Sequence, residues 1–162
     1  MDNTQTDHLK AYGIAFLNLK KFEDTMKQII ARILSFLPGL LFLSNAYTWI
    51  TNPLAASNGL GMEYLEGIGR STQIGDFSAF FIGVGIFCLL GSIFKNITFL
   101  ISAVIILLSA AIMRIVAWQI YSADFATIFI SVEIISSIMI IASVVLFRKK
   151  ENTIESPETE DS

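Results

Sequence analysis

Four long apolar runs dominate the hydrophobic pattern of this 162-residue chain. They cover residues 29–50, 77–94, 97–120 and 125–147, and none has the period-two alternation of a barrel strand. About 20 helical residues, each rising about 1.5 Å, cross about 30 Å of hydrocarbon, so every run comes close to one crossing. The pattern predicts an all-α fold, an integral membrane bundle of four transmembrane helices.

Polar segments flank these runs and divide the chain into residues 1–28, 29–147 and 148–162. The first segment is a predicted cytoplasmic arm, in which Tyr12, Phe16 and Leu19 recur at helical spacing. This spacing favours either a juxtamembrane amphipathic helix or an extension of the first span. In the last segment, positions 151–162 hold five acidic residues and no basic one, which predicts a disordered acidic tail. The first apolar run exceeds the about 7–15 residues of a signal-peptide core, so we expect a retained span.

The distribution of charge predicts the orientation of the bundle. Basic residues gather before the first span, between the second and third spans, and after the fourth, at Lys10, Lys20, Lys21, Lys27, Lys95, Arg148, Lys149 and Lys150. The other two connections carry Glu63, Glu66, Asp76 and Asp124 against a single Arg70. Because basic residues stay on the cytoplasmic side, we expect both termini inside and residues 51–76 outside.

Local signals set the connections between the spans. Asn52-Pro53 is expected to end the first span, and the glycine-bracketed stretch 59–69 is expected to form one or two helical turns at the interface. The connections 95–96 and 121–124 are so short that spans two, three and four must be antiparallel neighbours. Trp49 and Trp118 lie near the outer boundary and are typical of an interfacial aromatic belt.

Arg114 and Glu133 are each an isolated charge inside a predicted span. An ionised side chain near mid-bilayer costs about 2.5–3.5 kcal/mol on insertion scales, so such residues usually have a partner or a function. Helical rise places them about 9 Å and about 12 Å from the outer ends of their spans, where adjacent antiparallel helices let them meet. Ala110, Ala111 and Ala117 flank the arginine, and Ser136 and Ser137 follow the glutamate, which favours helix contacts.

Two further polar residues extend this layer towards the other spans. Asn45 lies about 8 Å below the outer end of the first span, and Asp76 opens the second with Ala79 and Gly83 on its face. Asn45, Asp76, Arg114 and Glu133 are therefore the candidate binding residues, above an inner half that is almost wholly apolar. The structural alternatives are an ion pair that fixes helix register, and a helix N-cap for Asp76.

Several classes of site are disfavoured by what the chain lacks. Cys88 is the only cysteine and His8 the only histidine, so no metal site and no cofactor bound by such residues is expected. No nucleophile–base pair or phosphate loop is recognisable, so no catalytic residue is proposed and an enzyme is unsupported. The basic residues form no stripe with interleaved aromatics, so nucleic acid is not an expected partner.

The order of elements from Arg32 to Phe147 carries a family resemblance. An arginine near the start of the first span, the Asn52-Pro53 break, Asp76, Arg114 and Glu133 occur in this order. In this respect the chain resembles a bacterial domain-of-unknown-function family of small four-helix membrane proteins, distantly similar to the DoxX-like group. A glycine pair usual in that family is replaced here by Phe77-Ser78-Ala79. The resemblance implies a bundle in a bacterial inner membrane and no established activity.

Three functional hypotheses follow from the sequence. The leading one is a non-enzymatic multi-pass protein whose outward-facing polar layer binds a small molecule, a lipid headgroup or a partner helix. The second is a proton- or ion-coupled transporter subunit that uses Glu133, which needs a homo-oligomer or another membrane protein because four spans are few. The third, an accessory subunit of a membrane oxidoreductase, is implied only by the family resemblance.

Overall fold

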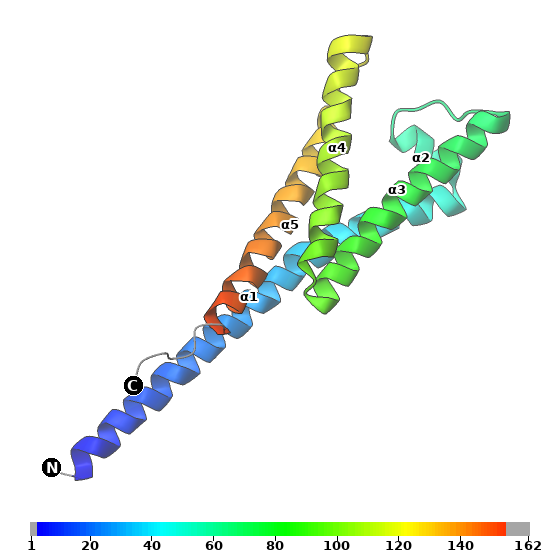
Figure 1. Ribbon diagram of the computed structural model, residues 1–162. Coiled ribbons are helices and arrows are strands. Elements are labelled where there is room, and N and C mark those ends of the chain that lie inside the picture. Colours follow the sequence, from blue (N-terminus) through cyan, green and yellow to red (C-terminus); the bar gives the residue numbers. More distant parts are fainter. Residues whose placement is uncertain (1–2, 155–162) are drawn as a thin grey trace.

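The computed structural model of the protein describes residues 3–154, with side chains described for residues 12–148. This part of the chain folds into five helices and contains no strand (Figure 1). In chain order the helices are α1 (Asn3–Thr51), α2 (Pro53–Gly59), α3 (Gly67–Phe94), α4 (Ile97–Tyr121) and α5 (Thr127–Ile154). The predicted all-α fold is confirmed.

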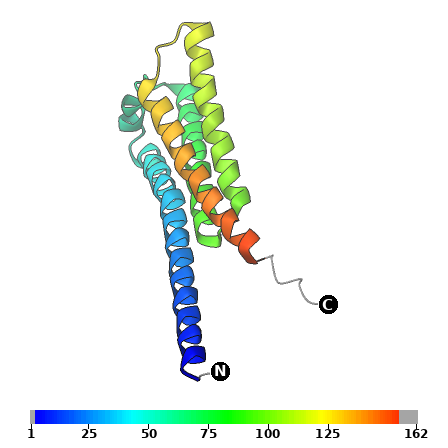
Figure 2. The ribbon, with the colours of Figure 1, turned by 90° about the vertical axis from the view of Figure 1, so that its left-hand side faces the viewer.

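The four long helices form a ring in which each packs against two neighbours. Helix α1 contacts α3 and α5, and α4 contacts the same two helices from the other side (Figure 2). One end of the bundle carries α2 and the α4–α5 connection, and we call it the α2 end. The opposite end, the terminal end, carries the start of α1 and the end of α5 (Figure 1). Figure 1 also shows the α4–α5 pair leaning away from the α1–α3 pair towards the α2 end.

Four of these helices are long and apolar enough to cross a membrane. They are Tyr12–Thr51 within α1, Gly67–Phe94, Ile97–Tyr121 and Thr127–Arg148 within α5. Large apolar side chains are exposed along all four, among them Ile50, Ile93, Ile105 and Ile138. Soluble proteins rarely expose apolar surface on this scale, whereas a lipid environment accepts it. The structure thus agrees with a multi-pass membrane protein.

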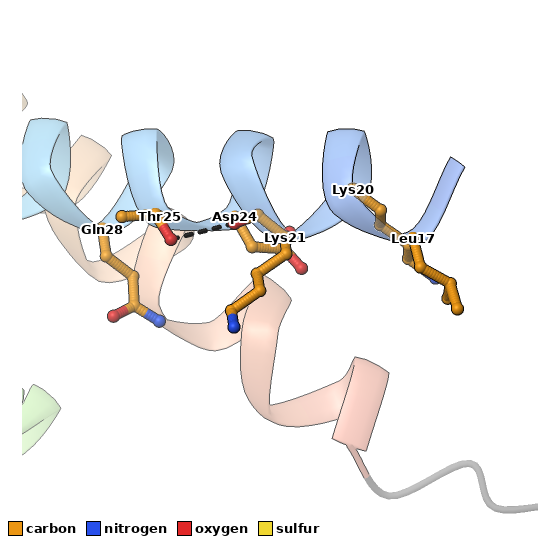
Figure 3. A pocket seen from close by; sticks show the side chains of 6 residues that line it. All are labelled: Leu17, Lys20, Lys21, Asp24, Thr25 and Gln28. Atoms are coloured by element: carbon orange, nitrogen blue, oxygen red, sulfur yellow. Dashed lines mark hydrogen bonds between the residues drawn. The ribbon is translucent and has the colours of Figure 1, made fainter. Parts of the chain in front are cut away.

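Helix α1 runs without interruption through Pro38 and through the predicted N-terminal arm. Its first part projects beyond the bundle at the terminal end, so the arm continues the first long helix and is not a separate surface helix (Figures 1 and 2). Apolar side chains on this projection, such as Tyr12 and Phe22, are exposed. A shallow recess on the same stretch is lined by Leu17, Lys20, Lys21, Asp24, Thr25 and Gln28 (Figure 3).

The segment predicted as an outer loop, residues 51–76, is shorter than expected. Helix α2 begins at Pro53, after Asn52 caps it by accepting a hydrogen bond from the backbone N–H of Ala55 at 3.2 Å. Helix α3 begins ten residues earlier than the predicted second span, at Gly67, whose φ of 57° completes the turn from the loop. The helical turns expected over residues 59–69 are wrong for residues 60–66, which are not helical.

At the other end of the chain, α5 continues beyond the expected tail boundary at residue 148 and ends at Ile154. Residues 155–162, which hold most of the predicted acidic tail, lie outside the described part of the chain.

Helices α1 and α3 approach most closely where each has a glycine. A Cβ added to Gly85 would lie 3.1 Å from the carbonyl oxygen of Gly39, and one added to Gly39 would lie 3.3 Å from that of Gly85. Small residues permit this backbone contact, which is the usual means of helix association in lipid. Towards the α2 end the same pair is joined by Trp49, stacked on Phe77 with ring centroids 5.0 Å apart. Trp49 is only 1% exposed, so its predicted place in an interfacial belt is wrong.

The terminal half of the core is less apolar than the sequence suggested. Ser35, Ser92 and Ser143 are buried there. The hydroxyl of Ser143 donates to that of Ser35 at 3.2 Å, joining α5 to α1, and the hydroxyl of Ser92 donates to the carbonyl of Arg32 at 3.0 Å. Serine is only weakly polar on hydropathy scales and hydrogen-bonds readily within helices, so the apolar runs did not predict these polar contacts.

Candidate functional site

Arg114 on α4 and Glu133 on α5 form an ion pair near the α2 end of the bundle. The Nε–H of the arginine donates to Oε1 of the glutamate at 3.0 Å. The α4–α5 connection makes this possible. Helix α4 ends at Tyr121, its C-cap Ser122 adopts the left-handed conformation with φ of 52°, and α5 then returns antiparallel beside it. The predicted meeting of the two charges is therefore present in the structure.

The two partners differ in exposure. The Glu133 side chain is 5% exposed and the Arg114 side chain 33%. The guanidinium carbon of Arg114 lies 5.0 Å from the centre of the Phe129 ring, so the ring covers part of the cation. The pair is thus anchored at its carboxylate, while the arginine reaches towards the surface.

Only one carboxylate oxygen of Glu133 is satisfied by the chain. Oε2 is buried, and it has no hydrogen-bond partner among the residues that the structure describes. A buried, unpaired acceptor costs about 1–3 kcal/mol, and more when charged, so such atoms usually meet a water, an ion or a ligand. Among the described residues, the hydroxyl of Ser78 is the other buried side-chain group without a partner, and it carries no charge.

A cavity of about 160 Å³ adjoins the ion pair. It lies among α1, α3, α4, α5 and the loop after α2, and its polar lining consists of Asn45, Arg114 and Glu133. The rest of the wall is aromatic and aliphatic, formed by Phe42, Phe80, Phe81, Phe129, Leu41, Leu60, Ile128 and Val132. Three of the four predicted binding residues therefore share one cavity with a largely apolar wall.

Asn45 takes part in this cavity through only part of its side chain. Its amide Nδ2 donates to the carbonyl of Leu41 on its own helix at 2.9 Å, and the residue is half-buried. This bond fixes the orientation of the amide. Asn45 forms part of the α1 wall of the cavity, beside the ion pair, as its predicted depth in the first span suggested.

Asp76 lies outside the cavity. It is exposed and stands well inside α3, whose N-cap position is occupied by Glu66. Both expectations for Asp76, a place at the start of the second span and an N-cap, are therefore wrong. They failed because the polar residues at the start of α3 were read as loop. The expected small-residue contact also fails, since Ala79 is exposed and a Cβ on Gly83 would meet nothing within 4 Å.

The loop after α2 contributes Leu60 to the cavity wall and is held by α3. The Nε2–H of Gln73 donates to the carbonyl of Glu63 at 3.0 Å, and its Oε1 accepts from the backbone N–H of Leu65 at 3.2 Å. Arg70 adds a bond from Nε to the carbonyl of Leu65 at 2.9 Å. These contacts hold residues 60–66 in place, with Leu60 lining the cavity. Nothing in the sequence distinguishes Gln73, because a glutamine in a predicted loop is ordinary.

Three of the small residues predicted to favour helix contacts beside the ion pair are buried. Ala111, Ser136 and Ser137 are buried, and the hydroxyl of Ser137 donates to the backbone carbonyl of Glu133 at 2.7 Å. Among the residues that the structure describes, His, Cys, Asp and Glu form no group of three or more that could hold a metal ion. What the site offers chemically is one carboxylate acceptor, one partly exposed guanidinium and an apolar wall.

No protein-family model, curated protein or solved structure matches this chain.

Proposed function

We propose that this protein is a multi-pass protein of a bacterial inner membrane that binds a small molecule in the cavity beside Arg114 and Glu133. The observation that carries the proposal is the convergence of polar side chains from α1, α4 and α5 on one cavity of about 160 Å³. An ion pair that served only to fix helix register would be expected to be packed on all sides. Here both members of the pair, Arg114 and Glu133, line a cavity.

The charge pattern supports an arrangement in which the α2 end faces the outside. Lys95 lies at the terminal end, where α1 also carries Lys20 and Lys21 and where α1 begins and α5 ends. Glu63 and Asp124 lie in the connections at the α2 end. Under the positive-inside rule, both termini are cytoplasmic and the cavity is reached from the outer side.

The core below the cavity favours binding over transport. Val84, Cys88, Leu107 and Ile140 are fully buried in the middle of the bundle. They come from α3, α4 and α5 and pack with α1 residues in a single core cluster. A transported solute would have to displace this packing to reach the terminal end, whereas a bound molecule needs only the cavity.

Native mass spectrometry of the protein released from its own membranes in mild detergent tests the proposal. Val132→Phe should fill the cavity without removing either charge, since Val132 lines it. The matched control is Ile135→Phe, on the exposed face of the same helix. We expect a small molecule or lipid that is retained by the native protein and the control and is lost in Val132→Phe.

Two results would contradict the proposal. The native protein released without any bound molecule would leave the cavity with no ligand. Equal retention in Val132→Phe and in Ile135→Phe would place the bound molecule elsewhere on the surface. A co-purifying protein that is lost in Val132→Phe would replace the small molecule with a partner helix.

A further inference from the structure

We propose that the ligand of this cavity is a compact apolar molecule, or the apolar end of a larger one, with an uncharged hydrogen-bond donor that it presents to Glu133 Oε2. A hydroxyl group is the simplest such donor. The inference rests on the proposed function, because it names the chemistry of the molecule that the same cavity takes.

The need for a donor follows from the bonding of Glu133. Oε1 accepts from Arg114 at 3.0 Å, whereas buried Oε2 has no partner among the described residues. Oε2 exposes less than 1 Å², but Glu133 lines the cavity, so a small rotation of its carboxylate presents this oxygen to a ligand there. A carboxylate oxygen can only accept, so the missing partner must be a donor. Asn45 does not serve this purpose in the structure, since its Nδ2 donates to Leu41 and makes no hydrogen bond to Oε2.

The absence of a net charge on the ligand follows from the pair itself. Arg114 and Glu133 balance each other, so the cavity has no surplus charge for an ionic ligand to neutralise. An anion would meet the carboxylate, and a cation would meet the guanidinium, within a poorly screened apolar site. An uncharged donor gains the hydrogen bond without either repulsion.

The size and apolar body of the ligand follow from the wall. The volume of about 160 Å³ is close to that of an engineered cavity, about 150 Å³, that binds benzene. Phe42, Phe80, Phe81 and Phe129 offer ring faces and edges to such a body. One ring, or a short branched chain, fills the space.

Three small fluoroaromatic probes separate the donor from the apolar body: para-fluorophenol, which donates; para-fluoroacetophenone, which only accepts; and fluorobenzene, which does neither. Their binding to the full chain in phosphatidylcholine nanodiscs is followed by fluorine NMR, with empty nanodiscs as the reference. We expect the phenol to bind about tenfold more tightly than the ketone, since a hydrogen bond to a charged group contributes about that factor.

Glu133→Gln is the decisive variant because it turns the free position from an acceptor into a donor while keeping the shape of the side chain; it also removes the charge that balances Arg114. The amide Oε1 can still accept from Arg114, and Nε2 then donates into the cavity. We expect the preference to reverse, with the ketone binding more tightly than the phenol. Asp76→Asn, which makes the same change outside the cavity, should keep the native order.

The outcomes separate this inference from the function beneath it. If all three probes bind equally, and Val132→Phe abolishes their binding, the cavity is a ligand site and the donor proposal is wrong, as expected if a fixed water satisfies Oε2. If Glu133→Gln weakens the phenol and the ketone by the same factor, the donor proposal is also wrong. If no probe binds above the empty nanodiscs, or Val132→Phe binds as the native protein does, the proposed function falls with it.

Discussion

Glu133 accepts a hydrogen bond from Arg114 through Oε1 at 3.0 Å, while its second oxygen is buried without a partner in the described chain. This asymmetry distinguishes the pair from a closed, bidentate bridge, in which both oxygens would be used. The carboxylate therefore has one partner on α4 and one oxygen without a partner, and Glu133 also lines the cavity. The stability of the α4–α5 pair and the chemistry of the cavity are thus linked through one side chain.

The link between the two charges is open to a double-mutant cycle. Arg114→Ala should destabilise the protein more than the double variant Arg114→Ala/Glu133→Ala does, because the single change leaves a buried carboxylate unpaired. We expect a coupling energy of about 1–3 kcal/mol, measured by unfolding with increasing dodecyl sulfate in mixed micelles. Asp76→Ala, at an exposed site, should add independently to Arg114→Ala. Additive effects of Arg114→Ala and Glu133→Ala would show that the pair does not interact.

The crossing of α1 and α3 should be sensitive to a single methyl group. Gly85→Ala would place a Cβ 2.6 Å from Cγ of Leu43 and 3.1 Å from the carbonyl oxygen of Gly39. We expect a loss of about 1–3 kcal/mol, the usual cost of overpacking. Gly83→Ala on the same helix meets nothing within 4 Å and should be neutral, or stabilising through its helix propensity. The same dodecyl sulfate titration compares them, and equal stability of the two variants would refute the close contact.

The loop of residues 60–66 should become more mobile when Gln73, which holds it to α3, is removed. Gln73→Ala deletes the bonds to the Glu63 carbonyl and the Leu65 N–H, each contributing about 1 kcal/mol. Hydrogen exchange should therefore accelerate over residues 60–66 and remain unchanged in α4 and α5. Thr72→Ala, at the exposed neighbouring position, is the control and should leave the loop protected. Unchanged exchange in Gln73→Ala would mean that the amide does not hold the loop.

How much the sequence predicted depends on whether a feature is local. The third span was expected over 97–120 from its apolar run, and α4 covers Ile97–Tyr121. The helix begins directly after Asn96, whose side chain accepts from the Thr98 N–H at 2.9 Å. The first residues of α3 were missed because Ser71, Thr72 and Gln73 are polar, and hydropathy alone does not separate a polar helical turn from a loop.

The candidate site divides in the same way. Arg114 and Glu133 were recognised because a charge inside an apolar run is conspicuous and costly. The phenylalanine wall was not recognised, since any of the 13 phenylalanines could face lipid or core, and only tertiary packing decides between them. Asp76 was placed wrongly because its position depended on the misjudged start of α3.

Cysteine accessibility tests most directly whether the cavity opens to the outside of the membrane. The parent protein supplies the background, since its only cysteine, Cys88, is fully buried. Asn45→Cys places a thiol on the cavity wall, and Ile135→Cys places one on the exposed surface of α5. A membrane-impermeant methanethiosulfonate added to spheroplasts should modify the cavity thiol about tenfold faster, because only a hydrated thiol ionises readily. Equal rates at the two positions, or reaction of Asn45→Cys only in inverted vesicles, would contradict an outward-facing binding cavity.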